Sequence, residues 1–165
     1  MKATMKKITA QYVKDRTFLA KGESNHWVAF DTGKQAGGGN AASAPMEMVL
    51  MALATCSGLD VAVILEKRRV QLDDFRIEVT GERADTHPKV YTDIHVKYYF
   101  TSPDLTEKFA NKAIDLSQDK YCSVSAMLRS TAEITSEFEI IRPDGQLSDN
   151  GKSAELAEET DSNFH

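Results

Sequence analysis

The 165-residue sequence has few cysteines, no excess of positive charge and no recognisable secretion signal. No segment approaches the roughly 20 uninterrupted apolar residues that a membrane-spanning helix needs. The lysines near the N-terminus are not followed by the apolar stretch of a signal peptide. Apolar residues make up 41% and charged residues 27% of the chain, which is typical of a folded soluble domain. We therefore expect a cytoplasmic protein that does not associate with a membrane.

The negative charge is concentrated at the C-terminal end. Residues 143–165 contain six acidic residues and one lysine, whereas residues 1–142 carry 19 charges of each sign. A neutral body offers no basic surface to phosphate backbones, so nucleic acid is not an expected partner. The tail has only three bulky apolar residues and buries too little surface to offset its ordering entropy. We predict one domain over residues 1–142 and a disordered acidic tail over residues 143–165.

The two cysteines, Cys56 and Cys122, are 66 residues apart. Because purely structural disulfides are rare in the cytosol, they are either two inert thiols or a redox pair. The four histidines show no spacing with the cysteines that is typical of a metal site. Neither a metal ion nor a bound cofactor is expected.

Apolar periodicity predicts an α+β fold. A glycine-rich connector is expected over residues 33–43. Strands are predicted over residues 8–14, 17–20, 26–30, 72–79, 90–100 and 132–141, and helices over residues 45–69, 103–121 and 122–129.

The helix over residues 45–69 is the most informative segment. Pro45 suits a first helical position, and Glu47 at the start and basic residues 67–69 at the end match the helix dipole. Nearly every residue between them is apolar or small, so we expect the helix to be buried on all sides. A chain of this length can hardly enclose such a helix alone, which predicts an obligate dimer.

The two cysteines occupy different positions in their helices. Cys56 lies in the middle of the long helix, where packing alone would explain a lone cysteine. Cys122 lies at the start of a helix, where free N–H groups and the positive end of the dipole favour the thiolate.

Two segments, PMEMVLMALATCSGLD (45–60) and KYCSVSAML (120–128), resemble the OsmC/Ohr family of osmotically inducible and organic hydroperoxide resistance proteins, and most closely its YhfA-like branch. The order of predicted elements agrees over residues 5–141. The resemblance implies an OsmC-like fold, in which antiparallel sheets surround a long buried central helix. It also implies an intertwined homodimer with two active sites at the subunit interface.

The resemblance further implies a peroxidase mechanism that uses both cysteines. Cys56 would attack an organic hydroperoxide and become a sulfenic acid, and Cys122 would resolve it as a disulfide that an external dithiol then reduces. Peroxidases of this family place a glutamate directly after the motif proline and pair it with an arginine. Here that position is Met46, so Glu47 and Arg16 are the candidates for these two roles.

Two charged residues argue against a fast peroxidase. Glu47 precedes Cys56 by nine residues, which places the two on opposite sides of a regular helix. Asp60 follows Cys56 by four residues on the same helix face, and its carboxylate would raise the thiol pKa.

Three functions therefore remain open: a thiol peroxidase, a protein that binds a small apolar or thiol ligand in the dimer cleft, and a redox sensor. In the second, Met46, Met48 and Met51 would line the cleft.

Overall fold

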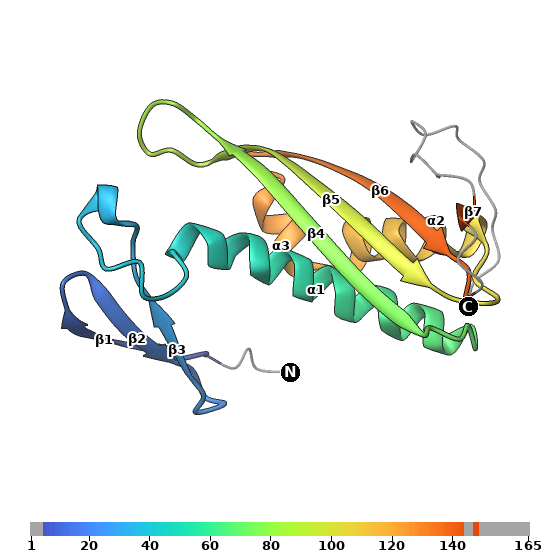
Figure 1. Cartoon of the computed structure of the whole chain (residues 1–165), viewed down its shortest axis with the longest axis horizontal. Coiled ribbons are helices and arrows are strands. Elements are labelled where there is room, and N and C mark those ends of the chain that lie inside the picture. Colours follow the sequence, from blue (N-terminus) through green and yellow to red (C-terminus); the bar gives the residue numbers. More distant parts are fainter. Residues whose placement is uncertain (1–4, 144–146, 149–165) are drawn as a thin grey trace. The chain divides into compact units, whose positions relative to one another are not determined.

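The computed structural model (Figure 1) describes residues 5–143 and 147–148. Two compact units are present, one up to Met51 and one from Ala52 onward, with the long helix α1 beginning in the first and continuing through the second. The elements are β1 (Thr9–Lys14), β2 (Thr17–Lys21), β3 (Trp27–Phe30), η1 (Lys34–Ala36), α1 (Pro45–Lys67), β4 (Asp74–Arg83), β5 (Tyr91–Thr101), α2 (Glu107–Leu116), η2 (Ser117–Tyr121), α3 (Ser123–Leu128), β6 (Glu133–Ile141) and β7 (Leu147–Ser148).

The first unit is built on a three-stranded antiparallel sheet in the order β1-β2-β3. Asp15 and Arg16 form the tight turn between β1 and β2, and both have positive φ angles, of 47° and 73°. A two-residue turn with positive φ at both positions has a backbone twist that matches the right-handed twist of the two strands it joins. The three predicted N-terminal strands are therefore confirmed, and Arg16 is placed at a hairpin tip.

The glycine-rich connector after β3 is organised by one buried carboxylate. Asp31 is 1% exposed and accepts hydrogen bonds from the backbone N–H groups of Thr32, Gly39 and Ala41. These bonds, that from Ala41 first, lower the pKa of Asp31. A Cβ atom on Gly38 would lie 2.2 Å from the Thr32 carbonyl oxygen, so the loop requires glycine there.

The second unit contains a sheet in the order β4-β5-β6-β7. β4 and β5 pair antiparallel, but β5 and β6 pair parallel over nine residues, which corrects the expectation of purely antiparallel sheets. The helical connection through α2, η2 and α3 returns the chain to the same end of the sheet, and parallel pairing requires such a crossover. The parallel strands are visible as β5 and β6 in Figure 1.

Two residues of the predicted tail form β7, because Leu147 and Ser148 pair with Ile141 and Ile140 of β6. For them the expectation of disorder is wrong. Apart from Pro143, the rest of the tail lies outside the described residues.

The core of the second unit follows the alternation predicted for β5. Ile94, Val96, Tyr98 and Phe100 are at most 2% exposed. Phe100 stacks on Phe75 of β4 with ring centroids 4.8 Å apart. The helix α1 contributes its buried residues to this core. They recur every three to four residues and so lie along one face of the helix: Leu53, Ser57, Gly58, Val61 and Leu65.

Gly58 of α1 faces the side chain of Ile77 on β4. A Cβ atom at this position would lie 2.7 Å from the Ile77 Cδ1 atom. The absence of a side chain at Gly58 therefore leaves room for the end of the Ile77 side chain against the helix.

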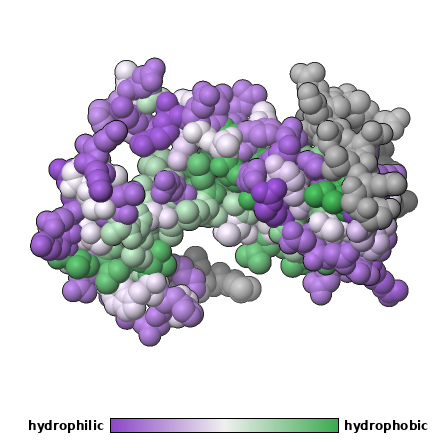
Figure 2. Space-filling view, viewed as in Figure 1, coloured by the Kyte–Doolittle hydropathy of each residue, from purple (hydrophilic) through white to green (hydrophobic). Residues whose placement is uncertain are grey.

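Within one chain, α1 is not buried on all sides. Its residues Leu59 and Val63 are 69% and 44% exposed, and apolar surface appears as green patches on each unit in Figure 2. One chain therefore does not enclose α1, as its length predicted, and burial of the remaining face by a second copy stays a prediction. Although α1 has no uninterrupted apolar run of about 20 residues, its length and composition would also allow it to cross a membrane, as do those of core helices in soluble proteins.

The predicted helix over residues 103–121 starts later, at Glu107, and its end at residue 121 is confirmed, although the last five residues are π-helical. The Thr106 hydroxyl caps α2 by accepting the Phe109 N–H group, so the helix begins at Glu107. After Leu116 the backbone widens into the π-helical turn η2, which ends immediately before Cys122.

Candidate functional site

The two cysteines, far apart in sequence, lie next to each other in the second unit. The sulfur atoms of Cys56 and Cys122 and a carboxylate oxygen of Asp60 all lie within 4.8 Å of one another. Asp60 and Cys56 share a face of α1 because they are one helical turn apart. Cys122 lies between η2 and α3. Its backbone N–H group donates to the Ser117 carbonyl of η2 at 2.7 Å, which fixes its position.

The environment of Cys122 favours the thiol rather than the thiolate. Cys122 caps α3 and its sulfur accepts the Ser125 N–H group at 3.4 Å, as the sequence predicted for a helix start. However, the side chain is 2% exposed, and this burial raises the pKa of Cys122. The nearby Cys56 sulfur acts in the same direction, whereas the Ser125 N–H group opposes it. Burial thus outweighs the helix end, which corrects the expectation of a thiolate there.

A chain of buried hydroxyl groups leads to Asp60. The Tyr98 hydroxyl lies 2.6 Å from the Ser57 hydroxyl, which lies 3.0 Å from that of Ser117, and the Ser117 hydroxyl donates to Asp60 Oδ2 at 3.3 Å. At the other end, Gln118 Nε2 donates to the Tyr98 hydroxyl at 3.3 Å. Because an ionised carboxylate only accepts, one consistent arrangement has every hydroxyl proton in the chain directed toward Asp60.

This network connects α1, β5 and η2 directly beside Cys56. Burial raises the pKa of Tyr98, so its hydroxyl remains protonated and able to donate. Arg129 lies at the far end, donating to Gln118 Oε1 at 3.4 Å and pairing with Asp119 at 3.1 Å. Sequence reasoning missed Ser117, Tyr98 and Arg129 here, because no motif spacing links them to the cysteines. For Asp60, the four-residue offset from Cys56 was the available signal.

An apolar groove of about 630 Å³ begins at Asp60. Aliphatic side chains of α1, Leu116 and Tyr121 line it, together with four basic residues. None of the three methionines predicted to line a ligand cleft belongs to this groove. The lining residues are Leu59, Asp60, Val63, Ile64, Lys67, Arg68, Lys112, Leu116, Lys120 and Tyr121.

The other two predicted site residues belong to the first unit. Glu47 accepts the Ala44 N–H group at 2.8 Å, the contact of a side chain that caps the start of its own helix. Arg16 packs against Gly37, where an added Cβ atom would lie 2.8 Å from the guanidinium carbon. Arg16 and Asp31 also line a separate groove of about 410 Å³ within this unit.

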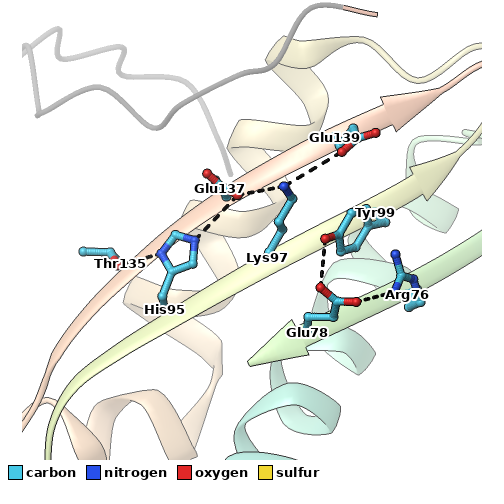
Figure 3. Close-up of polar contacts among 8 residues, drawn as sticks. All are labelled: Arg76, Glu78, His95, Lys97, Tyr99, Thr135, Glu137 and Glu139. Atoms are coloured by element: carbon cyan, nitrogen blue, oxygen red, sulfur yellow. Dashed lines mark hydrogen bonds and ion pairs between the residues drawn. The ribbon is translucent and has the colours of Figure 1, made fainter. Parts of the chain in front are cut away.

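A second polar cluster lies on the outer face of the sheet (Figure 3). His95 contacts Thr135 at 2.9 Å and lies 3.8 Å from Glu137, which pairs with Lys97 at 2.9 Å. The paired lysine lowers the pKa of Glu137. His95 thus points outward from β5, as its alternation predicted, and lies beside the Lys97–Glu137 ion pair on the surface.

Comparisons with known proteins show the family to which this chain belongs. The family model described as OsmC-like protein matches residues 37–137. The chain is 37% identical to protein YhfA of Escherichia coli K12 over 131 residues, which covers 79% of this chain and 95% of the relative. This chain belongs to the OsmC-like protein family.

Solved structures support the same fold. A hypothetical protein from Aquifex aeolicus VF5 is 31% identical, with a TM-score of 0.75 over 85% of this chain and 98% of that one. An organic hydroperoxide resistance protein OsmC from Legionella pneumophila superposes with a TM-score of 0.62 over 82% of this chain and 96% of that one. At 13% identity, the latter similarity shows a shared OsmC-like fold.

Proposed function

We propose that this member of the OsmC-like family is a thiol-dependent reductase of organic hydroperoxides. The observation that carries the proposal is the position of the Cys56 and Cys122 sulfur atoms within 4.8 Å of each other. A relative of the same fold is named an organic hydroperoxide resistance protein, which supports this class of substrate.

In this reaction the more exposed cysteine, Cys56, attacks the peroxide, and the buried cysteine, Cys122, resolves the intermediate. The Cys56 thiolate attacks the terminal peroxide oxygen, the O–O bond breaks, and the alkoxide leaves as an alcohol after taking up a proton. The resulting Cys56 sulfenic acid condenses with the Cys122 thiol, which releases water and forms a disulfide. An external dithiol reduces the disulfide and becomes oxidised itself, so no resident cofactor is needed.

The raised pKa of Cys122 suits a resolving residue better than an attacking one. A neutral buried thiol reacts slowly with peroxide, so the first step is left to Cys56. Resolution then requires the two sulfurs to approach to about 2.05 Å, the length of a disulfide bond.

The direct test is to follow both sulfurs through one oxidation. Reduced wild-type protein mixed with one equivalent of cumene hydroperoxide should lose both thiols and the mass of two hydrogens. A Cys122→Ser variant should instead gain one oxygen at Cys56 and react with dimedone, a sulfenic acid reagent. Two intact thiols in the wild-type protein after this treatment would overturn the proposal.

The family resemblance is the ground for a further part of the proposal, in which Glu47 and Arg16 activate the Cys56 thiolate. If the charge of Glu47 is required, Glu47→Gln should lower the rate of peroxide consumption by about 10-fold or more. The glutamine oxygen can still accept the Ala44 N–H group, so the helix cap is preserved. Glu47→Ala removes both charge and cap and should also lower the melting temperature, through a loss of about 1 kcal/mol. Unchanged kinetics in Glu47→Gln would leave Glu47 as a cap alone.

The groove at Asp60 favours a second candidate function, the binding of a small apolar ligand. Four aliphatic side chains and Tyr121 give it apolar surface, and its lining residue Asp60 lies within 4.8 Å of the two sulfur atoms. Binding without reduction predicts ligand-dependent shifts in melting temperature that persist when both cysteines are serine.

We further propose that the protein is a homodimer in which a second copy covers the exposed face of α1. Leu59 and Val63 are apolar and largely uncovered in one chain. A Leu59→Glu variant should run as a monomer in light scattering at a concentration where the wild type is a dimer. Glu66→Gln, an exposed change on the same helix, is the control and should remain dimeric; an unchanged mass for Leu59→Glu would contradict this interface.

A further inference from the structure

The strongest unassigned feature is the combination of Asp60 with the two cysteines. Each of the three side chains offers one ligand atom, and all three atoms lie within 4.8 Å of one another. Two thiolates and one carboxylate are typical ligands of zinc, which binds both soft sulfur and harder oxygen atoms. We propose that the reduced protein binds one zinc ion through Cys56, Asp60 and Cys122.

The spacing of the ligand atoms fits the ion. In a tetrahedral site with Zn–S distances of about 2.3 Å, two sulfur atoms lie about 3.8 Å apart. Shifts of no more than about 1 Å would bring the three atoms from their present separation to this geometry. The three protein ligands leave one tetrahedral position for water.

The surroundings hold the carboxylate in place. Asp60 Oδ2 accepts a hydrogen bond from Ser117, whose hydroxyl also lies 3.0 Å from that of Ser57. Outer hydrogen bonds of this kind orient metal ligands and raise affinity. A bound zinc ion would also explain why a carboxylate lies beside the two cysteines. The charge of the cation offsets the mutual repulsion of two thiolates and a carboxylate, which would otherwise hinder formation of the Cys56 thiolate.

In a single chain the cluster is open on one side. Asp60 lines the apolar groove, and Cys56 and Asp60 are both partly exposed, whereas Cys122 is buried. Binding would release the two thiol protons to solvent. The zinc site and the disulfide use the same sulfurs, so each state excludes the other: the oxidised protein binds no zinc, and bound zinc protects the cysteines from hydroperoxide.

The experiment uses full-length reduced protein, stripped with a chelator and titrated with zinc or cobalt in the absence of peroxide. We expect one ion per chain and, with cobalt, the thiolate-to-metal charge-transfer absorption of a tetrahedral site. Both signals should be lost in Cys56→Ser, in Cys122→Ser and in disulfide-oxidised wild type. Asp60→Asn should weaken zinc binding by at least about 100-fold. Asp115→Asn, an exposed carboxylate on α2, is the matched control and should bind as wild type.

The outcomes separate this proposal from the peroxidase. Binding that persists in both cysteine variants, a cobalt spectrum without thiolate absorption, or equal affinity of Asp60→Asn and wild type would each overturn the zinc site. The disulfide experiment with cumene hydroperoxide is run in chelator and does not depend on zinc. Peroxidase activity without zinc binding therefore disproves the metal site alone, and the converse result disproves the peroxidase alone.

Discussion

A Cys56→Ser variant should consume alkyl hydroperoxide at least about 1000-fold more slowly than the wild-type chain when a dithiol is supplied. The serine hydroxyl keeps nearly the size of the thiol but does not form an anion near neutral pH, so the attacking atom is lost without a large change in packing. Stopped-flow measurement of hydroperoxide consumption gives the rate directly.

The control for this experiment is Cys122→Ser. Its buried thiol takes no part in the first step, so this variant should react once at nearly the wild-type rate and then lose activity as Cys56 is oxidised further. Equal turnover by Cys56→Ser and wild type would show that the hydroperoxide is reduced elsewhere or not by this protein. A first step lost only in Cys122→Ser would reverse the roles of the two cysteines.

Local patterns in the sequence predict much of the fold. Alternation in residues 90–100 identified Tyr98 and Phe100 as inward-facing and His95 as outward-facing, because a strand repeats every two residues. Pro45 and the apolar run after it predicted α1, whose bounds the structure confirms to within two residues.

Features that depend on packing between distant segments could not be predicted in this way. The predicted helices between β5 and β6 allow parallel pairing, but that these two strands are neighbours in the sheet depends on long-range contacts, which no local pattern encodes. The apolar composition of α1 predicted burial on all sides, but composition does not tell which side the same chain covers and which is left for a partner.

The candidate site, too, could be predicted from the sequence only in part. Motifs around Cys56 and Cys122 indicated a redox pair, and the fold places the two sulfurs together. The helix-start position of Cys122 was predicted correctly, yet the pKa of its thiol is raised, because burial depends on tertiary packing. Asp60 entered the sequence argument only as a nearby negative charge, since Ser117, its hydrogen-bond donor, lies 57 residues away.

Phe100→Ala should cause the largest loss of stability of any substitution considered. Phe100 is 0% exposed, stacks on Phe75 at 4.8 Å and meets Phe138 edge-on at 6.4 Å. Removing a buried phenyl ring costs the transfer free energy of the ring and leaves a cavity, together about 3–5 kcal/mol. For a chain of this size the melting temperature should fall by roughly 6–20 °C.

The matched control for Phe100→Ala is its neighbour Tyr99, which points to the opposite face of β5. The Tyr99 hydroxyl donates to Glu78 at 2.8 Å on the outer surface, and the ring lies beside Arg76 and Lys97 (Figure 3). Tyr99→Ala removes these surface contacts without opening a cavity, so its cost should be no more than about 1 kcal/mol. Both variants should be melted at one protein concentration, because dimer formation would add to the apparent stability. A Phe100→Ala variant as stable as Tyr99→Ala would mean that the stacked rings under β5 are not the core of this unit.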